Sequence, residues 1–111
     1  MTPEKKMAKT CVVFVTVDKK NRAKQITSHV LKKKLAACVN TIGRIDSSYW
    51  WKGKIEKSGE LLLIMKTKKS LFKKLEAEIK KIHPYSVPEI ISLDITAGNP
   101  GYLSWILAET K

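Results

Sequence analysis

The stretch Leu35–Thr67, LAACVNTIGRIDSSYWWKGKIEKSGELLLIMKT, contains two long segments of β-favouring residues on either side of a short turn, Lys52-Gly53-Lys54. Gly53 supplies the backbone freedom that a tight turn needs. Each arm has about fourteen to sixteen residues and would span on the order of 50 Å at about 3.3 Å per residue. A domain of this length has a radius of gyration of about 13 Å. The sequence therefore predicts a hairpin that overhangs its own domain or bends sharply, with Gly43 and Ser58-Gly59 as the expected bulge sites.

Three consecutive aromatic residues, Tyr49, Trp50 and Trp51, lie in the first arm of this hairpin. An overhanging hairpin exposes strand edges and aromatic surface, which natural proteins cover. We expect a second copy of the chain to be the cover, which places the three aromatics in a subunit interface. The alternative is a platform that stacks nucleic-acid bases, but the aromatic and glycine signature of RNA-recognition modules is missing from both central strands.

The remaining segments complete a regular order of elements. We expect a buried strand over Cys11–Asp18, an amphipathic helix over Arg22–Lys34, a second helix from Ser70 to near His83, a strand over Ile90–Thr96 and a short helix from Pro100. The expected N-caps are Asp18 or Asn21, Ser70, and Asn99. This order predicts an α+β, ferredoxin-like βαββαβ sandwich with an extra C-terminal helix and both main helices on one face of the sheet.

The last strand and the last helix carry apolar residues that need cover. In the strand, Ile91, Leu93 and Ile95 alternate with polar residues, which indicates one face turned to the core. The final helix is apolar on several sides, so we expect it to be buried against its own domain or a neighbouring one.

The composition fits one globular domain, which we assign to residues 10–111 after a flexible basic tail over residues 1–9. No apolar segment suits a signal peptide or a membrane span, so we expect a cytoplasmic protein without a membrane partner. The net charge is +12, from 22 Lys/Arg against 10 Asp/Glu. Nearly all the basic residues are lysine and they are spread along the chain, which favours a solvated surface over a nucleic-acid face.

No catalytic motif is present, and we expect a protein that is not an enzyme. Glu56 and Glu60 are expected to offset lysine charge on a solvated hairpin. His29 is expected to be exposed. His83 stands at a helix end near Glu89, where it could serve a metal or acid–base site or could cap the helix, and capping is favoured.

Several motifs together resemble the CutA family of divalent-cation tolerance proteins. The matching segments are LAACVN at 35–40, YWWKGKIE at 49–56, the run from Glu60 to Thr67, HPYSVPEII at 83–91 and YLSWI at 102–106. The resemblance implies a homotrimer in which the hairpin reaches the adjacent subunit. The shape is similar to that of PII signalling proteins, which implies small-ligand sensing in clefts between subunits. The family's role implies a response to divalent metal ions, copper above all.

The resemblance also implies site residues. The family's histidine-proline-tyrosine segment is matched by His83, Pro84, Tyr85, Pro88 and Glu89. Carried over, it makes His83 and Glu89 the candidate ligands of Cu(II) or another divalent cation, and no other cofactor is expected. The candidate ligand cleft comprises Cys38, Lys66, Tyr85, Tyr102 and Trp105, and the trimer interface comprises Tyr49, Trp50 and Trp51. A PII-like signalling or scaffold role and a basic nucleic-acid-binding module are the alternatives.

Overall fold

The computed structural model describes residues 8–111. Its elements are β1 (Thr10–Val17), α1 (Lys20–Lys32), β2 (Cys38–Trp51), β3 (Lys54–Lys68), a 3-10 turn (Lys69–Leu71), α2 (Phe72–Ile82), β4 (Ile90–Asp94) and α3 (Pro100–Ala108). Most of the predicted tail, residues 1–7, lies outside the described residues. Lys9 is already attached to the domain, because its carbonyl accepts a hydrogen bond of 2.9 Å from the Lys69 N–H.

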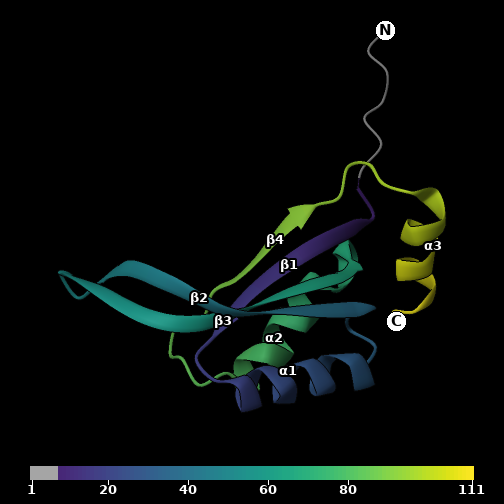
Figure 1. The fold of residues 1–111 in the computed structure, drawn as a ribbon. Coiled ribbons are helices and arrows are strands. Elements are labelled where there is room, and N and C mark those ends of the chain that lie inside the picture. The colour runs from purple at the N-terminus through teal and green to yellow at the C-terminus, as the bar shows by residue number, and fades with distance from the viewer. Residues whose placement is uncertain (1–7) are drawn as a thin grey trace, which may run out of the picture.

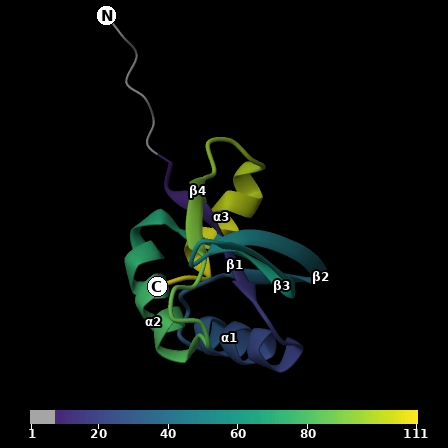
Figure 2. The same ribbon diagram turned by 90° about the vertical axis from the view of Figure 1, so that its left-hand side faces the viewer.

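One antiparallel sheet with the strand order β2-β3-β1-β4 forms the body of the protein. Figures 1 and 2 show α1 and α2 on the same side of this sheet, and α3 at the end opposite the hairpin tip. The predicted α+β, ferredoxin-like order with one extra C-terminal helix is confirmed.

The core lies between the sheet and the two long helices. Alternate residues of β1 turn toward the helices, so Val13, Val15 and Val17 have no exposed surface. They pack with apolar residues from β3, α1 and α2, namely Leu63, Met65, Ile26, Val30, Leu75 and Ile79. This arrangement leaves the other face of the sheet without a helix except at one end, where α3 lies beside β1 and β3.

The β2–β3 hairpin extends far beyond the rest of the sheet (Figure 1). β1 pairs with β3 only from Leu61 to Lys68, so residues 54–60 pair with β2 alone. The molecule measures 50 × 36 × 22 Å and its radius of gyration is 15.5 Å, larger than the value expected of a compact domain. The predicted overhang is therefore confirmed.

Two local features shape the hairpin. A register shift between Ile42 and Ile45 places Gly43 in a bulge, as predicted, whereas the pairing continues unbroken through Ser58 and Gly59, where a bulge was wrongly expected. At the tip, Lys52 and Gly53 have φ angles of 50° and 80°. Positive φ at both central residues is typical of a type I′ turn, which matches the twist of the strands.

The outer face of the sheet is apolar and open. On β4, Ile91 lies opposite Phe14 and Leu93 lies opposite Val12, on the side away from the helices. Ile91 and Leu93 are each 50% exposed, so the prediction that this face of the strand turns to the core is wrong within one chain. Alternation predicts that one face is covered, but it does not say which neighbour covers it.

Helix termini agree only partly with the sequence-based expectations. α1 begins after Lys19 without a side-chain cap, and α2 begins after a 3-10 turn that contains Ser70, so those predicted caps are wrong. At α3 the prediction is confirmed, because the Asn99 side chain accepts a hydrogen bond of 2.9 Å from the Gly101 N–H. Pro100 occupies the first turn, where it needs no N–H partner.

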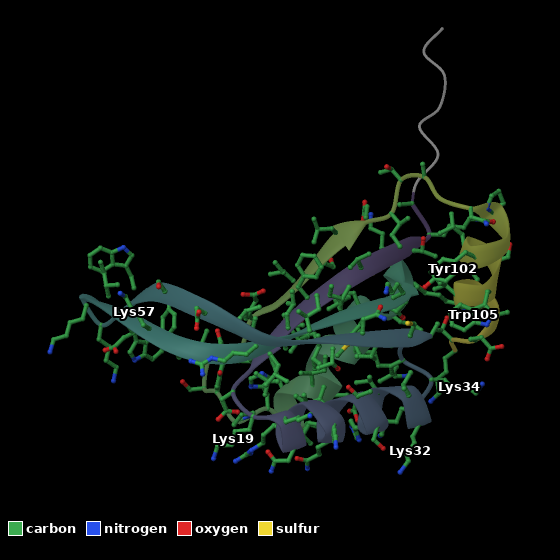
Figure 3. All side chains as sticks on the ribbon, in the orientation of Figure 1. Lys19, Lys32, Lys34, Lys57, Tyr102 and Trp105 are labelled. Atoms are coloured by element: carbon green, nitrogen blue, oxygen red, sulfur yellow. The ribbon has the colours of Figure 1, made fainter. Side chains whose placement is uncertain are left out.

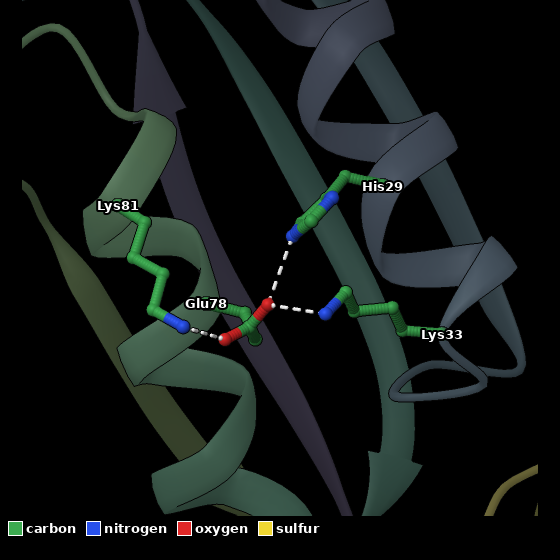
Figure 4. A network of polar contacts seen from close by, with 4 residues as sticks. All are labelled: His29, Lys33, Glu78 and Lys81. Carbon is green, nitrogen blue, oxygen red and sulfur yellow. Dashed lines mark hydrogen bonds and ion pairs between the residues drawn. The ribbon is translucent and has the colours of Figure 1, made fainter.

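A polar network joins the two core helices on their outer side (Figure 4). Glu78 of α2 binds three nitrogen atoms: His29 Nε2 of α1 at 3.1 Å, Lys33 Nζ of the residue that follows α1 at 3.0 Å, and Lys81 Nζ of α2 at 2.6 Å. Hydrogen bonds from Lys81 and Lys33 lower the pKa of Glu78 to about 2. His29 is therefore a partner in an interhelical contact, and the expectation that it is merely exposed is wrong.

Candidate ligand-binding sites

The first candidate site is at the base of the hairpin and centres on His83, the residue that ends α2. The His83 Nδ1 accepts a hydrogen bond of 3.1 Å from the Tyr85 N–H. Nε2 lies 2.8 Å from the carbonyl oxygen of Thr16 on β1. Since Nδ1 is an acceptor, the hydrogen must be on Nε2, which donates to Thr16. His83 is thus the C-cap residue of α2, and its ring connects the following loop to β1.

These bonds bear on the metal hypothesis for His83 and Glu89. Both ring nitrogens of His83 already have backbone partners, so neither offers a lone pair to a cation in this conformation. Among residues 8–111, no group of three His, Cys, Asp or Glu side chains is placed to hold a metal ion. The donor set of residues 8–111 in one chain does not fit a metal centre.

Tyr85 and Glu60 form the polar centre of the same site. The Tyr85 hydroxyl donates a hydrogen bond of 2.7 Å to Glu60 Oε2. Glu60 is only 7% exposed, although it was expected to be a solvated hairpin residue. Burial, followed by the adjacent Glu60 carboxylate, raises the pKa of Tyr85 well above its ordinary value. No pattern in the sequence around Glu60 predicts its burial, because that burial depends on the loop that follows α2.

A cavity of about 580 Å³ lies beside this pair. Its lining comes from the overhanging part of the hairpin, the end of β1 and the loop after α2: Thr16, Ser47, Ser48, Tyr49, Trp51, Glu60, Tyr85, Ser86, Val87 and Glu89. Two of the three predicted interface aromatics, Tyr49 and Trp51, therefore turn toward the cavity of their own chain. Trp50 points to the opposite face of the strand and is 71% exposed.

The second candidate site lies beside α3 and gathers most of the predicted cleft residues. Cys38 and Lys66 are directly opposite each other on β2 and β3. The Lys66 ammonium hydrogen-bonds the side chain of Asn40. The rings of Tyr102 and Trp105 are 5.6 Å apart, and burial, followed by the nearby Cys38, raises the pKa of Tyr102.

Tyr85 is not part of this second group. Its partner Glu60 is six residues from Lys66 along β3, a separation of about 20 Å at 3.3–3.4 Å per residue. Figure 3 shows Tyr102 and Trp105 at the α3 end of the molecule, far from Lys57 on the hairpin. One chain therefore holds two separate groups of candidate residues and not the single cleft that the residue list predicts.

The fold and these sites define a ferredoxin-like α+β protein with a protruding hairpin and a cavity between that hairpin and the loop after α2. Comparison with known families identifies it further: residues 11–109 match the family model of the CutA1 divalent ion tolerance protein. The chain belongs to the CutA1 family.

Named relatives and solved structures agree with this assignment. The chain is 45% identical over 100 residues to "Protein CutA 1, chloroplastic" of Oryza sativa, covering 90% of this chain and 56% of the relative. It is 41% identical over 99 residues to the divalent-cation tolerance protein CutA of Thermus thermophilus, covering 89% and 96%. The crystal structure of CutA1 from Oryza sativa has a TM-score of 0.91 at 43% identity, covering 94% of this chain and 95% of that one.

The lengths differ between groups of relatives. The chain spans 55–62% of the length of the plant and animal relatives that it matches. Within residues 8–111, no helix has the length and apolar character needed to cross a membrane.

Proposed function

We propose that this chain is one subunit of a homotrimer without catalytic activity that binds divalent cations or a small ligand in clefts between subunits. Copper is the candidate cation, and the cytoplasm is the proposed location. The named CutA relatives support the tolerance role. The observation that carries the assembly is an apolar sheet face that residues 8–111 leave largely exposed, together with a long hairpin that extends beyond the rest of the sheet.

The open face has the character of an interface. Ile42 on β2, Ile91 and Leu93 on β4, and Tyr102 and Trp105 on α3 are all large, apolar and exposed. Large contiguous apolar surface on a soluble protein marks an interaction site. The two arms of the hairpin also leave backbone groups unpaired along their outer edges, which favours pairing with another chain.

Assembly would also explain why the predicted cleft residues fall into two groups. Tyr85 with Glu60 lies at one end of the sheet, and Cys38, Lys66, Tyr102 and Trp105 lie at the other. We propose that the first group of one subunit faces the second group of its neighbour. Metal binding at His83 and Glu89 requires a further ligand from such a neighbour, and His83 must release one of its two backbone partners.

Sedimentation at several protein concentrations tests the assembly. A mass of three chains that persists on dilution is expected, and a folded monomer at all concentrations would refute the trimer. Calorimetric titration with Cu(II) tests the metal role in wild type, His83→Ala and His29→Ala. His29 is the other histidine of the chain, so a loss of binding in His83→Ala alone is expected. Equal binding by all three removes His83 as a ligand.

PII-like signalling by a small ligand is the second candidate function, and the cavity of about 580 Å³ favours it. That volume lies in the range of about 300–1,000 Å³ found for small-molecule sites. A ligand screen on the assembled protein separates the two functions, because a signalling ligand should bind when chelator has removed all metal. Binding that needs metal supports the tolerance role.

A further inference from the structure

The surface formed by the two long helices carries most of the positive charge of the protein. Residues 19–34, which comprise α1 and the residues that flank it, contain seven Lys/Arg and no Asp or Glu. This segment therefore carries +7 of the net charge of +12. On the same side of the sheet (Figures 1 and 2), α2 adds four exposed lysines, Lys73, Lys74, Lys80 and Lys81. The fold thus brings together lysines that are spread along the sequence, and we call this surface of α1 and α2 the basic helix layer.

Most cations of the basic helix layer have no acidic partner. Glu78 pairs with Lys33 and Lys81, and Glu76 pairs with Lys80. Within residues 8–111, no ion pair involves the other Lys and Arg side chains of the layer, which are Lys19, Lys20, Arg22, Lys24, Lys32, Lys34, Lys73 and Lys74. All the lysines of this set are exposed. The layer therefore presents a surplus of ammonium groups to its surroundings.

The stability of α1 does not explain this placement of charge. The first turn begins with Lys20 and has no acidic residue, although the N-terminus of a helix favours negative charge. Lys20 and Lys24 are four residues apart, a spacing at which like charges repel. Figure 3 shows Lys19 at this end of α1 and Lys32 and Lys34 at the other end, so the charge extends along the whole helix. An anionic partner along α1 would remove both unfavourable effects.

The side chains of the layer select among anionic partners. Leu31, at 39%, is the only exposed apolar residue of α1, so the helix has little surface to insert into a lipid bilayer. Phe72, the only Phe, Tyr or Trp of the two helices, packs against the core and offers no ring on which single-stranded bases could stack. A duplex, in contrast, presents on the order of ten phosphate charges along the length of α1. Lysine neutralises phosphate as a compact point charge, and phosphate contacts carry no sequence information.

We propose that the basic helix layer binds the phosphate backbone of double-stranded nucleic acid, independently of base sequence. The layer lies on the side of the sheet opposite the open face (Figures 1 and 2), and it is this open face that other subunits cover in the proposed assembly. The lysines of α1 and α2 therefore face outward in a single chain and in the trimer alike. The proposal goes beyond the proposed function and uses none of its ligand residues.

Fluorescence anisotropy of the full chain with a labelled DNA duplex, at salt concentrations from about 50 to 200 mM, tests the proposal. A helix turns only part of its circumference to a partner, so we expect about four phosphate contacts. The logarithm of the binding constant should then fall with the logarithm of the salt concentration with a slope of about −4, which weakens binding by about two-hundredfold over this range. A second duplex of unrelated sequence should bind equally. No binding at the lowest salt, an affinity independent of salt, or a strong preference for one duplex would overturn the proposal.

A pair of double variants with the same change in net charge locates the binding surface. Lys24→Gln with Lys32→Gln removes two charges from exposed positions of α1, and glutamine keeps the helix propensity of lysine. We expect this double variant to weaken binding and to reduce the steepness of the salt dependence by about 2. Lys54→Gln with Lys57→Gln is the matched control, because both lysines are exposed on the hairpin, away from the layer, and its salt dependence should equal that of the wild type. Equal effects of the two double variants would show that binding follows net charge alone and would overturn the proposal.

Vesicles that contain phosphatidylglycerol provide the competing anionic surface. Binding to these vesicles that equals or exceeds binding to the duplex at the same salt concentration would overturn the proposal in favour of a membrane partner. Sedimentation of the same protein samples separates this proposal from the proposed function. A trimer that does not bind the duplex contradicts the nucleic-acid proposal and leaves the assembly intact, whereas a monomer that binds the duplex contradicts the assembly and supports the nucleic-acid proposal.

Discussion

Tyr85 and Glu60, 25 residues apart in sequence, are joined by a hydrogen bond of 2.7 Å between the phenol and a buried carboxylate. The bond connects the loop after α2 to the point where β3 leaves the sheet. The His83 ring holds the same loop to Thr16 of β1. Together these contacts fix the base of the hairpin and form one wall of the cavity.

Replacing Tyr85 by phenylalanine should destabilise the protein. The ring stays, but Glu60 loses its only hydrogen-bond donor among the described residues. A hydrogen bond to a charged group contributes about 1.5–3 kcal/mol, and we expect the lower end because water in the cavity can replace the phenol. Urea unfolding measures the change. In the Glu60→Gln background the same substitution should cost less, and an equal cost in both backgrounds would show that the pair is not coupled.

Alkaline pH should lower the stability of the wild-type protein more than that of the Tyr85→Phe variant. The pKa of Tyr85 is raised in the folded protein above its ordinary value of 10. The neutral phenol is therefore favoured by folding, so its contribution is fully present below pH 10 and is lost as the pH rises further. Melting temperatures between pH 8 and pH 11 measure this. Parallel curves for the two proteins would contradict the role of the phenol.

Acidic pH should destabilise the packing of α1 against α2, because it protonates Glu78. Its pKa is about 2 in the folded protein and ordinarily 4.5, so its stabilising contribution is present above pH 4.5 and is lost as the pH falls toward 2. Glu78→Gln should flatten the stability profile between pH 5 and pH 2 relative to wild type. Glu76→Gln is the control, because the only ion pair of Glu76 within residues 8–111 is with Lys80 of the same helix. Equal profiles for the two variants would argue against the network.

Much of the fold could be predicted from local patterns. The order of elements, the overhang of the hairpin, the bulge at Gly43 and the Asn99 cap all follow from the spacing of apolar residues and from turn chemistry. Ser70 failed as a cap because a 3-10 turn precedes α2. The prediction that Ile91 and Leu93 turn to the core was wrong, because periodicity indicates that one face of a strand is covered but does not identify what covers it.

The candidate site was less accessible to sequence analysis. Tyr85 was selected by its motif, but Glu60 and the cavity walls come together only through tertiary folding of three distant segments. The metal hypothesis for His83 depended on a free ring nitrogen. Sequence could not show that Thr16 and Tyr85 occupy both nitrogens, because neither contact follows from helical or strand spacing.

The tip of the hairpin offers a test of backbone strain. Gly53 has a φ of 80°, and a Cβ there would meet no other atom, so Gly53→Ala acts through conformation alone. We expect it to destabilise the hairpin by about 1 kcal/mol. Lys52 has a φ of 50° without being glycine, and Lys52→Gly should be neutral or slightly stabilising for the same reason. Hydrogen exchange of the arm amides measures both, and a protective effect of Gly53→Ala would contradict the turn assignment.

The open face of the sheet leads to a sharp test of assembly. Leu93 is 50% exposed in one chain, so Leu93→Glu should leave the fold of the subunit intact. If another subunit covers this face, the buried glutamate would cost several kcal/mol and the assembly should dissociate on dilution. Leu31→Glu is the matched control, because Leu31 is also exposed but lies on α1, on the opposite side of the sheet. Sedimentation of both variants, with circular dichroism to confirm folding, decides the matter. Dissociation in Leu93→Glu alone supports a subunit on the open face, whereas unchanged mass in both variants would place the interface elsewhere.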